Sequence, residues 1–326
     1  MSLYLVTGAA GFIGSNLVRT LLARGEKVRG VDNFSTGKHP NLHDIGGMEF
    51  FEGDINDAGL MKKACSGVDY VLHEAALPSV PRSVRDPVEC NHACLNGTLS
   101  VLMAAREAGV RRVVYAGSSA AYGDTPTLPK QEDMPPRPIS PYAVAKLGGE
   151  YYLQSFWRVY GVETVTLRYF NVFGPYQDPT SFYSGVLAKF ITLMLRGEQP
   201  TIFGDGEQSR DFTYIDNVVE ANLRACGADR DKVAGRVFNA ATGHRATLNE
   251  TFQILCELTD YKGLPAYREI REGDIKDSLA DITRARHALG YEPKVSFREG
   301  LRKTVEWYKS QPAHSASENA KTGTPR

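Results

Sequence analysis

The stretch Thr7-Gly8-Ala9-Ala10-Gly11-Phe12-Ile13-Gly14 decides the fold of this chain. It follows a short apolar run and precedes a longer stretch in which apolar residues recur with a helical period. In such a strand-to-helix turn, Gly8 permits the tight turn, Gly11 lets the backbone approach a pyrophosphate, and Gly14 lets helix and strand pack closely. The spacing is GxxGxxG, and in this context it predicts a dinucleotide-binding βαβ unit.

Alternating strand and helix patterns continue over the first 170 residues. The predicted strands are residues 3–7, 27–31, 48–52, 70–74, 112–116 and 162–169. The predicted helices are residues 12–22, 59–65, 89–108 and 142–159. Because strands that alternate with helices form parallel sheets with right-handed crossovers, the sequence predicts an α/β protein with a doubly wound, parallel-sheet Rossmann fold.

The pattern changes after residue 170, where Pro, Gly and Tyr become frequent and the periodic segments become shorter. The segments predicted here are helices at 186–195, 217–226, 248–259 and 297–309 and a strand at 237–240. We expect a smaller mixed α/β substrate lobe at about 171–310, interleaved with an NAD-binding domain at 1–170 whose last elements return at about 205–245. The small and polar residues 311–326 are predicted to be a disordered tail.

Asp32, at the end of the second strand, selects the dinucleotide. A carboxylate at this place accepts hydrogen bonds from an adenosine ribose 2′-OH and repels a 2′-phosphate, so it favours NAD over NADP. Other candidates lie in the polar loop that follows and at the ends of later strands. The candidate cofactor-binding residues are Gly8, Gly11, Phe12, Ile13, Gly14, Asp32, Asn33, Ser35, Thr36, Gly37, Asp54, Ile55, Ala75, Ala76, Tyr142, Lys146 and Tyr169.

Ser118, Tyr142 and Lys146 are the candidate catalytic residues. Tyr142 and Lys146 are four residues apart, so they lie on the same side of a helix, and Ser118 follows the fifth strand. A tyrosine has a reference pKa of about 10, but a lysine ammonium and a nicotinamide cation nearby both favour the phenolate. Tyr142 is therefore predicted to accept a proton, Ser118 to hold the substrate hydroxyl, and Lys146 to bind the nicotinamide ribose.

The overall charge excludes several classes of partner. Among 326 residues, 38 are basic and 38 acidic, so no net charge attracts nucleic acid or an anionic membrane. Cys90, His92 and Cys94 could form half of a metal site, but no second pair of ligands appears, and we predict no metal. We also expect reduced thiols, a cytoplasmic location and no transmembrane helix, because no apolar run approaches about 20 residues.

The order of the motifs resembles one known family. Besides the glycine loop, Ser118 and the Tyr142/Lys146 pair, the motifs are RYFNVFGP at 168–175, GDG at 204–206 with RDF at 210–212, and REGD at 271–274. Together they resemble the extended short-chain dehydrogenase/reductases, specifically the NAD-dependent UDP-sugar 4-epimerases. The resemblance implies that Asn171, Arg210, Arg271 and Asp274 bind the UDP portion, and that the protein is a homodimer paired through helices 89–108 and 142–159.

The same resemblance narrows the reaction and the sugar. Related dehydratases carry a Thr-Asp-Glu triplet where this chain has Ser118-Ser119-Ala120, which disfavours dehydration. In 4-epimerases a tyrosine at position 278 excludes N-acetyl sugars and a small residue admits them, so Ser278 favours UDP-N-acetylglucosamine (UDP-GlcNAc) and UDP-GalNAc, with UDP-glucose and UDP-galactose as a second pair. The candidate substrate-binding residues are Ser79, Ser118, Ser119, Tyr142, Asn171, Arg210, Arg271, Asp274 and Ser278.

Two alternatives remain open from the sequence. One is an enzyme that epimerises or decarboxylates UDP-glucuronate, which would need a cationic residue near the sugar C6. The other is a non-catalytic NAD-binding protein, although such proteins commonly lose the Tyr-Lys pair that this chain keeps. The chain also departs from the family at position 94, where Cys94 replaces the usual asparagine near the cofactor.

Overall fold

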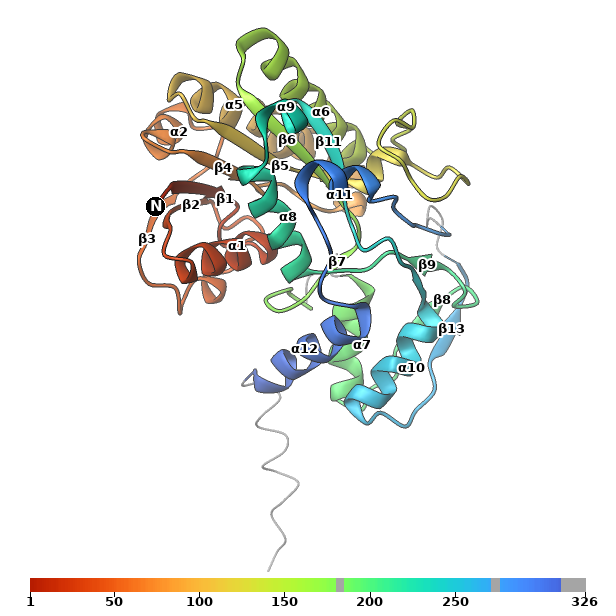
Figure 1. Ribbon diagram of the computed structural model, residues 1–326. Helices are drawn as coiled ribbons and strands as arrows, with labels where there is room; N and C mark the ends of the chain where they lie inside the picture. The colour runs from red at the N-terminus through yellow and green to blue at the C-terminus, as the bar shows by residue number, and fades with distance from the viewer. Residues whose placement is uncertain (180–184, 271–275, 312–326) are drawn as a thin grey trace, which may run out of the picture.

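The computed structural model of the protein describes residues 1–179, 185–270 and 276–311. Its centre is a seven-stranded sheet whose paired strands are all parallel, in the order β11-β6-β5-β4-β1-β2-β3 (Figure 1). The strands are β1 (Leu3–Thr7), β2 (Lys27–Asp32), β3 (Met48–Glu52), β4 (Tyr70–His73), β5 (Arg112–Ser118), β6 (Glu163–Tyr169) and β11 (Arg236–Ala240). The predicted doubly wound parallel fold is confirmed.

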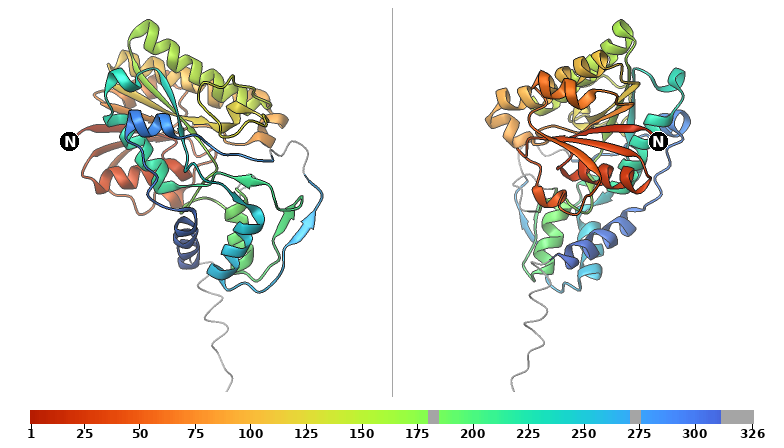
Figure 2. Two further views of the ribbon diagram at one scale, coloured as in Figure 1. Left: turned by 45° about the vertical axis from the view of Figure 1, so that its right-hand side comes forward. Right: turned by 90° about the vertical axis from the view of Figure 1, so that its left-hand side faces the viewer.

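Helices cover both faces of this sheet (Figures 1 and 2). One face carries α2 (Ala58–Cys65), α5 (Gly97–Glu107) and α6 (Pro141–Tyr160), which contact one another in that order. The other face carries α1 (Phe12–Ala23) and α8 (Ile215–Gly227), with α11 (Thr283–Leu289) beside α8. Strands covered on both faces have continuous apolar runs, and every residue of β4 is buried.

The smaller lobe lies below the sheet in Figure 1. Its helices α7 (Val186–Leu195), α10 (Leu248–Thr259) and α12 (Phe297–Ser310) pack on one another. Its short strands pair two by two: β8 (Thr201–Phe203) with β13 (Ala266–Arg268), β9 (Ser209–Arg210) with β12 (Ala246–Thr247), and β7 (Val172–Phe173) with β10 (Thr213–Tyr214). The division of the chain into domains at residue 170 stays a prediction.

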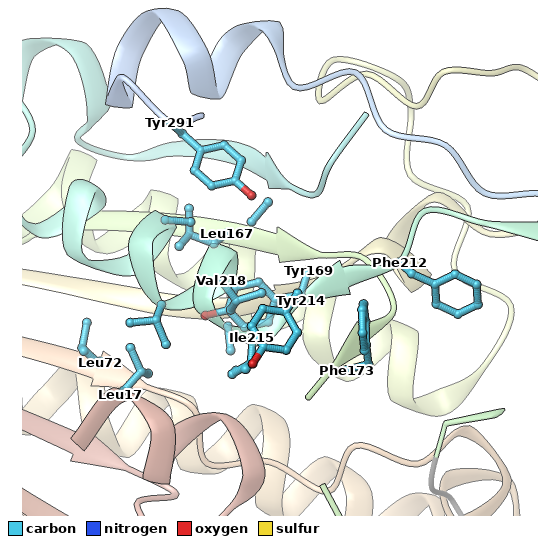
Figure 3. Close-up of a cluster of buried hydrophobic side chains, with 14 of the residues drawn as sticks. Leu17, Leu72, Leu167, Tyr169, Phe173, Phe212, Tyr214, Ile215, Val218 and Tyr291 are labelled. Carbon is cyan, nitrogen blue, oxygen red and sulfur yellow. The ribbon is translucent and has the colours of Figure 1, made fainter. Parts of the chain in front are cut away.

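One hydrophobic core joins the sheet to the lobe (Figure 3). Leu17 and Leu72 lie between the sheet and its helices, and the same cluster continues through Tyr214 to Phe173 and Phe212 on the lobe side. The ring of Phe212 stacks on that of Phe297, with centroids 5.0 Å apart. A site that lies between sheet and lobe is therefore held from both sides by packed side chains.

The predicted helix at 89–108 is interrupted, which corrects the sequence prediction. It consists of α4 (Pro87–Asn91), a π-helical turn (His92–Asn96) and α5. At this turn the Thr98 hydroxyl donates to the Cys94 carbonyl oxygen at 2.6 Å, and the Cys94 sulfur accepts a hydrogen bond from the Leu77 backbone N–H. Such turns widen a helix locally and are frequent near functional sites.

Several short helices were not predicted from the sequence. They are α3 (Val80–Arg85), α9 (Arg230–Val233), α11, and the 3₁₀ turns His39–Asn41 and Ser119–Tyr122. The α3 helix begins at a serine cap, because the Ser79 side chain accepts a hydrogen bond from the Arg82 N–H. Within the three described ranges, no helix is both long enough and apolar enough to span a bilayer.

Candidate active site

A cavity of about 800 Å³ opens at the carboxyl ends of the central strands. It lies where the strand order reverses, since β1 is flanked by β2 on one side and by β4 on the other. Ligands of doubly wound sheets bind at this place. The predicted residues that line it are Gly8, Gly11, Phe12, Ile13, Gly14, Asp32, Asn33, Ser35, Thr36, Asp54, Ile55, Ala75, Ala76, Ser79, Ser118, Ser119, Tyr142, Lys146, Tyr169 and Asn171.

The glycine loop has the close approaches that its spacing predicts. Gly8 has a φ of +69°, and a Cβ there would lie 2.8 Å from the backbone nitrogen of Ala75. A Cβ on Gly14 would lie 2.0 Å from the Gly8 carbonyl oxygen, so the first turn of α1 packs directly on the loop. No side chain caps α1 at Gly11, which leaves its first N–H groups available to an anion. The loop therefore fits a pyrophosphate.

Asp32 lies at the end of β2 with its carboxylate on the cavity wall. Its oxygens accept hydrogen bonds from the N–H groups of Ala10 (2.9 Å) and Phe34 (2.7 Å), while burial raises its pKa. Gly37 was predicted to contact the cofactor, but its position in the structure indicates a different role. Gly37 does not line the cavity, and a Cβ there would lie 2.7 Å from Asp32 Oδ1, so this glycine makes room for the carboxylate.

The three candidate catalytic residues meet at the other end of the cavity. Ser118 ends β5, and the Ser140 side chain caps α6 by accepting a hydrogen bond from the Ala143 N–H. Tyr142 is therefore in the first turn of α6 and Lys146 is one turn later, with both side chains on the cavity wall. Ser118 lies near enough to Tyr142 that hydrogen bonding between them lowers the pKa of the tyrosine. The arrangement can hold a hydroxyl and move its proton.

Burial governs the proton affinities of this catalytic end. It raises the pKa of Tyr142, to which negative charge on Cys94 adds, whereas the hydrogen bond with Ser118 lowers it. Burial also lowers the pKa of Lys146, and Cys94 and Glu74 oppose that change. The Lys146 ammonium lies 4.5 Å from the centre of the Tyr115 ring, a cation–π contact that favours the charged form.

Some residues of the cavity were missed from the sequence, and Glu74 is the most informative of them. It follows β4 directly and lines the cavity, and its Oε1 accepts a hydrogen bond from the Tyr169 hydroxyl at 2.7 Å. Burial raises its pKa to about 7. The rule that residues at the carboxyl ends of parallel strands gather at one edge of the sheet led to Ala75 and Ala76, and it would also have led to Glu74.

The predicted UDP-binding residues are only partly brought together. Asn171 lines the cavity, and its amide nitrogen donates to the Asp211 carbonyl oxygen (3.0 Å) and to Ser278 Oγ (3.1 Å). Ser278 thus lies behind Asn171 and does not line the cavity. Arg210 does not line it either, since its Nη1 donates to the carbonyl oxygens of Ser209 and Lys276. Arg271 and Asp274 lie outside the described residues.

The cysteines form no disulfide bond and all five are free. Across residues 1–179, 185–270 and 276–311, no cluster of three or more His, Cys, Asp or Glu side chains could hold a metal ion. Cys90 and Cys94 lie together in a buried apolar cluster with Leu77 and Ala145.

The predicted cytoplasmic location stays a prediction.

Comparison with known proteins identifies the family. The sequence model of the NAD dependent epimerase/dehydratase family matches residues 4–241. The chain belongs to this family. NAD is accordingly its cofactor, and the uncapped start of α1 and the Asp32 carboxylate fit the pyrophosphate and the adenosine ribose of that cofactor.

Three similar proteins each cover nearly the whole chain. The UDP-glucose 4-epimerase of Mycolicibacterium smegmatis (strain ATCC 700084 / mc(2)155) is 40% identical over 312 residues, which are 94% of this chain and 98% of that protein. The UDP-glucuronate 4-epimerase of Thermodesulfobacterium geofontis (strain OPF15) is 33% identical and covers 95% and 97%. The solved structure of UDP-N-acetylglucosamine 4-epimerase from Methanobrevibacter ruminantium M1, in complex with UDP-N-acetylmuramic acid, is 40% identical with a TM-score of 0.90 and covers 95% and 99%. These relatives share the 4-epimerase name and differ in the sugar.

Proposed function

We propose that this UDP-sugar 4-epimerase interconverts UDP-GlcNAc and UDP-GalNAc, with UDP-glucose and UDP-galactose as a second pair. The observation that carries the reaction is the convergence of Ser118, Tyr142 and Lys146 on one end of a cavity whose other end fits NAD. The observation that favours an N-acetyl sugar is the small side chain of Ser278 directly behind Asn171.

Each of the three residues has a defined task in this proposal. Ser118 holds the 4-hydroxyl of the sugar, and Tyr142 accepts its proton as the C4 hydrogen leaves as hydride. NAD, when bound, would supply the acceptor for this hydride and the source of its return to C4. The 4-keto sugar turns in the cavity so that its opposite face is reduced, and Tyr142 then gives the proton back. Lys146 lies beside this proton transfer; burial lowers its pKa, and the negative charges of Cys94 and Glu74 oppose that change.

The UDP portion is assigned to the lobe side of the cavity. We propose that Asn171, Arg210, Arg271 and Asp274 bind it, and that Ser79 and Ser119 contact the sugar. Ser79 and Ser119 line the cavity together with Ser118. A planar guanidinium such as that of Arg210 suits a diphosphate because it donates two hydrogen bonds at once.

The charges around the cavity oppose the UDP-glucuronate alternative. Apart from Lys146, the cationic side chains on the described part of its wall are Lys38 and Arg82. Lys38 is paired with Asp178 at 3.5 Å, and Arg82 makes a two-point pair with Glu89. A cation that already has a carboxylate partner gives little net attraction to a sugar carboxylate.

Product analysis with a substituted Ser278 tests the substrate assignment. The protein is expected to convert UDP-GlcNAc to UDP-GalNAc, and Ser278→Tyr is expected to reduce that activity about a hundredfold while UDP-glucose is still converted. A tyrosine behind Asn171 should push that side chain into the cavity, where only the N-acetyl group needs the space. Chromatographic separation of the products from each UDP-sugar measures both activities. Ser278→Ala is the control, since it keeps the side chain small and should keep both substrates. Formation of UDP-galacturonate or UDP-xylose from UDP-glucuronate would contradict the proposal.

The outer surface of α5 and α6 supports a proposed homodimer. Tyr151, Tyr152 and Val159 on α6 and Met103 on α5 are large apolar side chains that are exposed in a single chain. Pairing these two helices with their copies would cover the side chains in a four-helix arrangement. We expect light scattering to give a mass of twice 35.9 kDa.

A charge placed on this surface is expected to separate the two chains. Tyr151→Glu puts a carboxylate into the proposed interface and should give a mass near that of one chain. Tyr267→Glu is the matched control, because Tyr267 is exposed to a similar degree but lies on β13 of the lobe. A single-chain mass for the unsubstituted protein at micromolar concentration would refute the dimer.

A further inference from the structure

Residues 174–178 form a segment between the smaller lobe and the sheet, and the mechanism proposed above gives it no task. The segment follows β7 and contacts α1 on the sheet side and α12 on the lobe side (Figure 1). Tyr176 and Asp178 line the cavity, as does Phe12 at the start of α1. The segment is therefore part of the wall at the end of the cavity that fits the pyrophosphate of NAD.

Two contacts join the segment to α1. The Asn16 amide nitrogen donates to the Pro175 carbonyl oxygen at 3.1 Å and to the Phe12 carbonyl oxygen at 2.9 Å, so it ties the segment to the first turn of the helix. The Arg19 guanidinium lies 4.0 Å from the centre of the Tyr176 ring. This cation–π contact is attractive, and more so because the Arg19 side chain is only 21% exposed.

An ion pair joins the segment to the cofactor loop as well. Lys38 lies in the loop after β2, and its Nζ is 3.5 Å from Asp178 Oδ2. The Lys38 backbone N–H donates to the carbonyl oxygen of Ala10, in the glycine loop, at 2.9 Å. Because solvent reaches both side chains, the ion pair alone adds little and acts together with the contacts to α1.

On the lobe side, α12 holds the same residues. The Tyr176 and Trp307 rings have centroids 5.1 Å apart. The Tyr308 hydroxyl donates to the Gln177 carbonyl oxygen. Tyr176 also has a φ of +69°, a left-handed conformation that is rare for an aromatic residue. Such a conformation persists only where the surroundings hold it, and here the ring contacts both Arg19 and Trp307.

We propose that residues 174–178 are a clasp that retains NAD in the cavity. The lobe holds the clasp through α12, and the clasp holds α1, so the cofactor end opens only when the contacts of Pro175 and Tyr176 with α1 break. Epimerisation leaves NAD unchanged at the end of each turnover, so slow release keeps the protein loaded for the next one. The inference rests on NAD as the cofactor and not on the identity of the sugar.

The rate at which the loaded protein releases NAD tests the clasp directly. The protein is loaded with radiolabelled NAD, unlabelled NAD is added in excess, and the label retained on a filter is followed over time. Tyr176→Ala removes both ring contacts and is expected to release NAD about tenfold faster. Tyr176→Phe keeps the ring and should release NAD at the rate of the unsubstituted protein. That same slow rate in Tyr176→Ala would overturn the proposal.

Two further variants separate the ring contacts from backbone strain and from general packing. Tyr176→Gly loses the same ring but suits the positive φ, so it should release NAD as fast as Tyr176→Ala. Tyr160→Ala is the matched control, because the Tyr160 ring contacts Arg106 at 4.0 Å and Phe156 at 5.0 Å, and none of these three residues lines the cavity. Slow release from Tyr176→Gly, or fast release from Tyr160→Ala, would contradict the clasp.

Asn16 distinguishes a clasp from a direct contact between Tyr176 and NAD. Asn16 does not line the cavity, so Asn16→Ala acts on release only through the bond to Pro175 and the helix start, and we expect faster release. If both residues hold one clasp, Asn16→Ala should add little in a protein that already carries Tyr176→Ala. Unchanged release from Asn16→Ala, or a double variant whose effect is the product of the two single effects, would overturn the proposal. These measurements contain no UDP-sugar, so their failure is distinct from failure of the substrate assignment.

Discussion

Tyr142→Phe is expected to abolish epimerisation while the fold and the bound NAD remain. The substitution removes the hydroxyl next to Ser118 and leaves the ring in its half-buried place on α6. Without the hydroxyl, no group at this position accepts the proton of the 4-hydroxyl, and loss of a general base slows turnover by about a thousandfold or more. Product formation from UDP-GlcNAc and UDP-glucose measures the loss.

The control for this experiment is Tyr152→Phe. Tyr152 lies on the same helix with its ring partly exposed, and removal of its hydroxyl should leave turnover unchanged. The NAD released on denaturation should be equal in the two variants, because Tyr142 is at the catalytic end while the glycine loop and Asp32 hold the other end. Turnover in Tyr142→Phe within tenfold of the unsubstituted protein would rule out Tyr142 as the proton acceptor.

Gly14→Ala is expected to remove bound NAD and to destabilise the protein. A Cβ at position 14 would lie 2.0 Å from the Gly8 carbonyl oxygen and 2.8 Å from the Gly8 carbonyl carbon. Both are backbone atoms, so α1 must move away from the loop, and the free energy of unfolding should fall by about 2 kcal/mol. The N–H groups at the start of α1 would move with it, which disrupts the anion site.

Thermal unfolding and the NAD content of the purified protein measure these two effects. Gly227→Ala is the control, because no atom lies within 4 Å of a Cβ there and the residue is at the end of α8. It should be neutral or slightly stabilising, since alanine favours a helix. A Gly14→Ala protein with a full NAD content and an unchanged unfolding temperature would show that the close packing of α1 on the loop is unimportant.

Most of the sheet could be predicted from the sequence because buried parallel strands have short apolar runs at regular spacing. The exceptions have physical causes that a periodic pattern does not contain. The π turn at residues 92–96 depends on the bond between Thr98 and the Cys94 carbonyl and on a contact with Leu77, which is distant in sequence. Strands of two residues, such as β9 and β12, are too short to show any period.

The site residues that could be predicted from the sequence are those whose position depends only on where a single strand ends. Asp32, Ser118 and the glycine loop each follow or end a strand, and all line the cavity as predicted. Glu74 was missed because a glutamate in a sequence indicates an exposed charge, and its half-buried position depends on a hydrogen bond with Tyr169, 95 residues later. The lobe residues were harder still, since the directions of Arg210 and Ser278 depend on partners such as Lys276 and Asn171 rather than on local pattern.

The position of β11 has a consequence for how the protein is made. This strand, residues 236–240, pairs with β6 and forms one edge of the sheet. Helix α8, residues 215–227, covers one face of the sheet beside these two strands. A growing chain that has emerged from the ribosome only as far as residue 170 therefore has an unpaired β6 edge and an uncovered apolar face. Exposed edges of this kind pair with other chains. We therefore expect the first 170 residues alone to be prone to association with other chains until the later segment covers this edge and face.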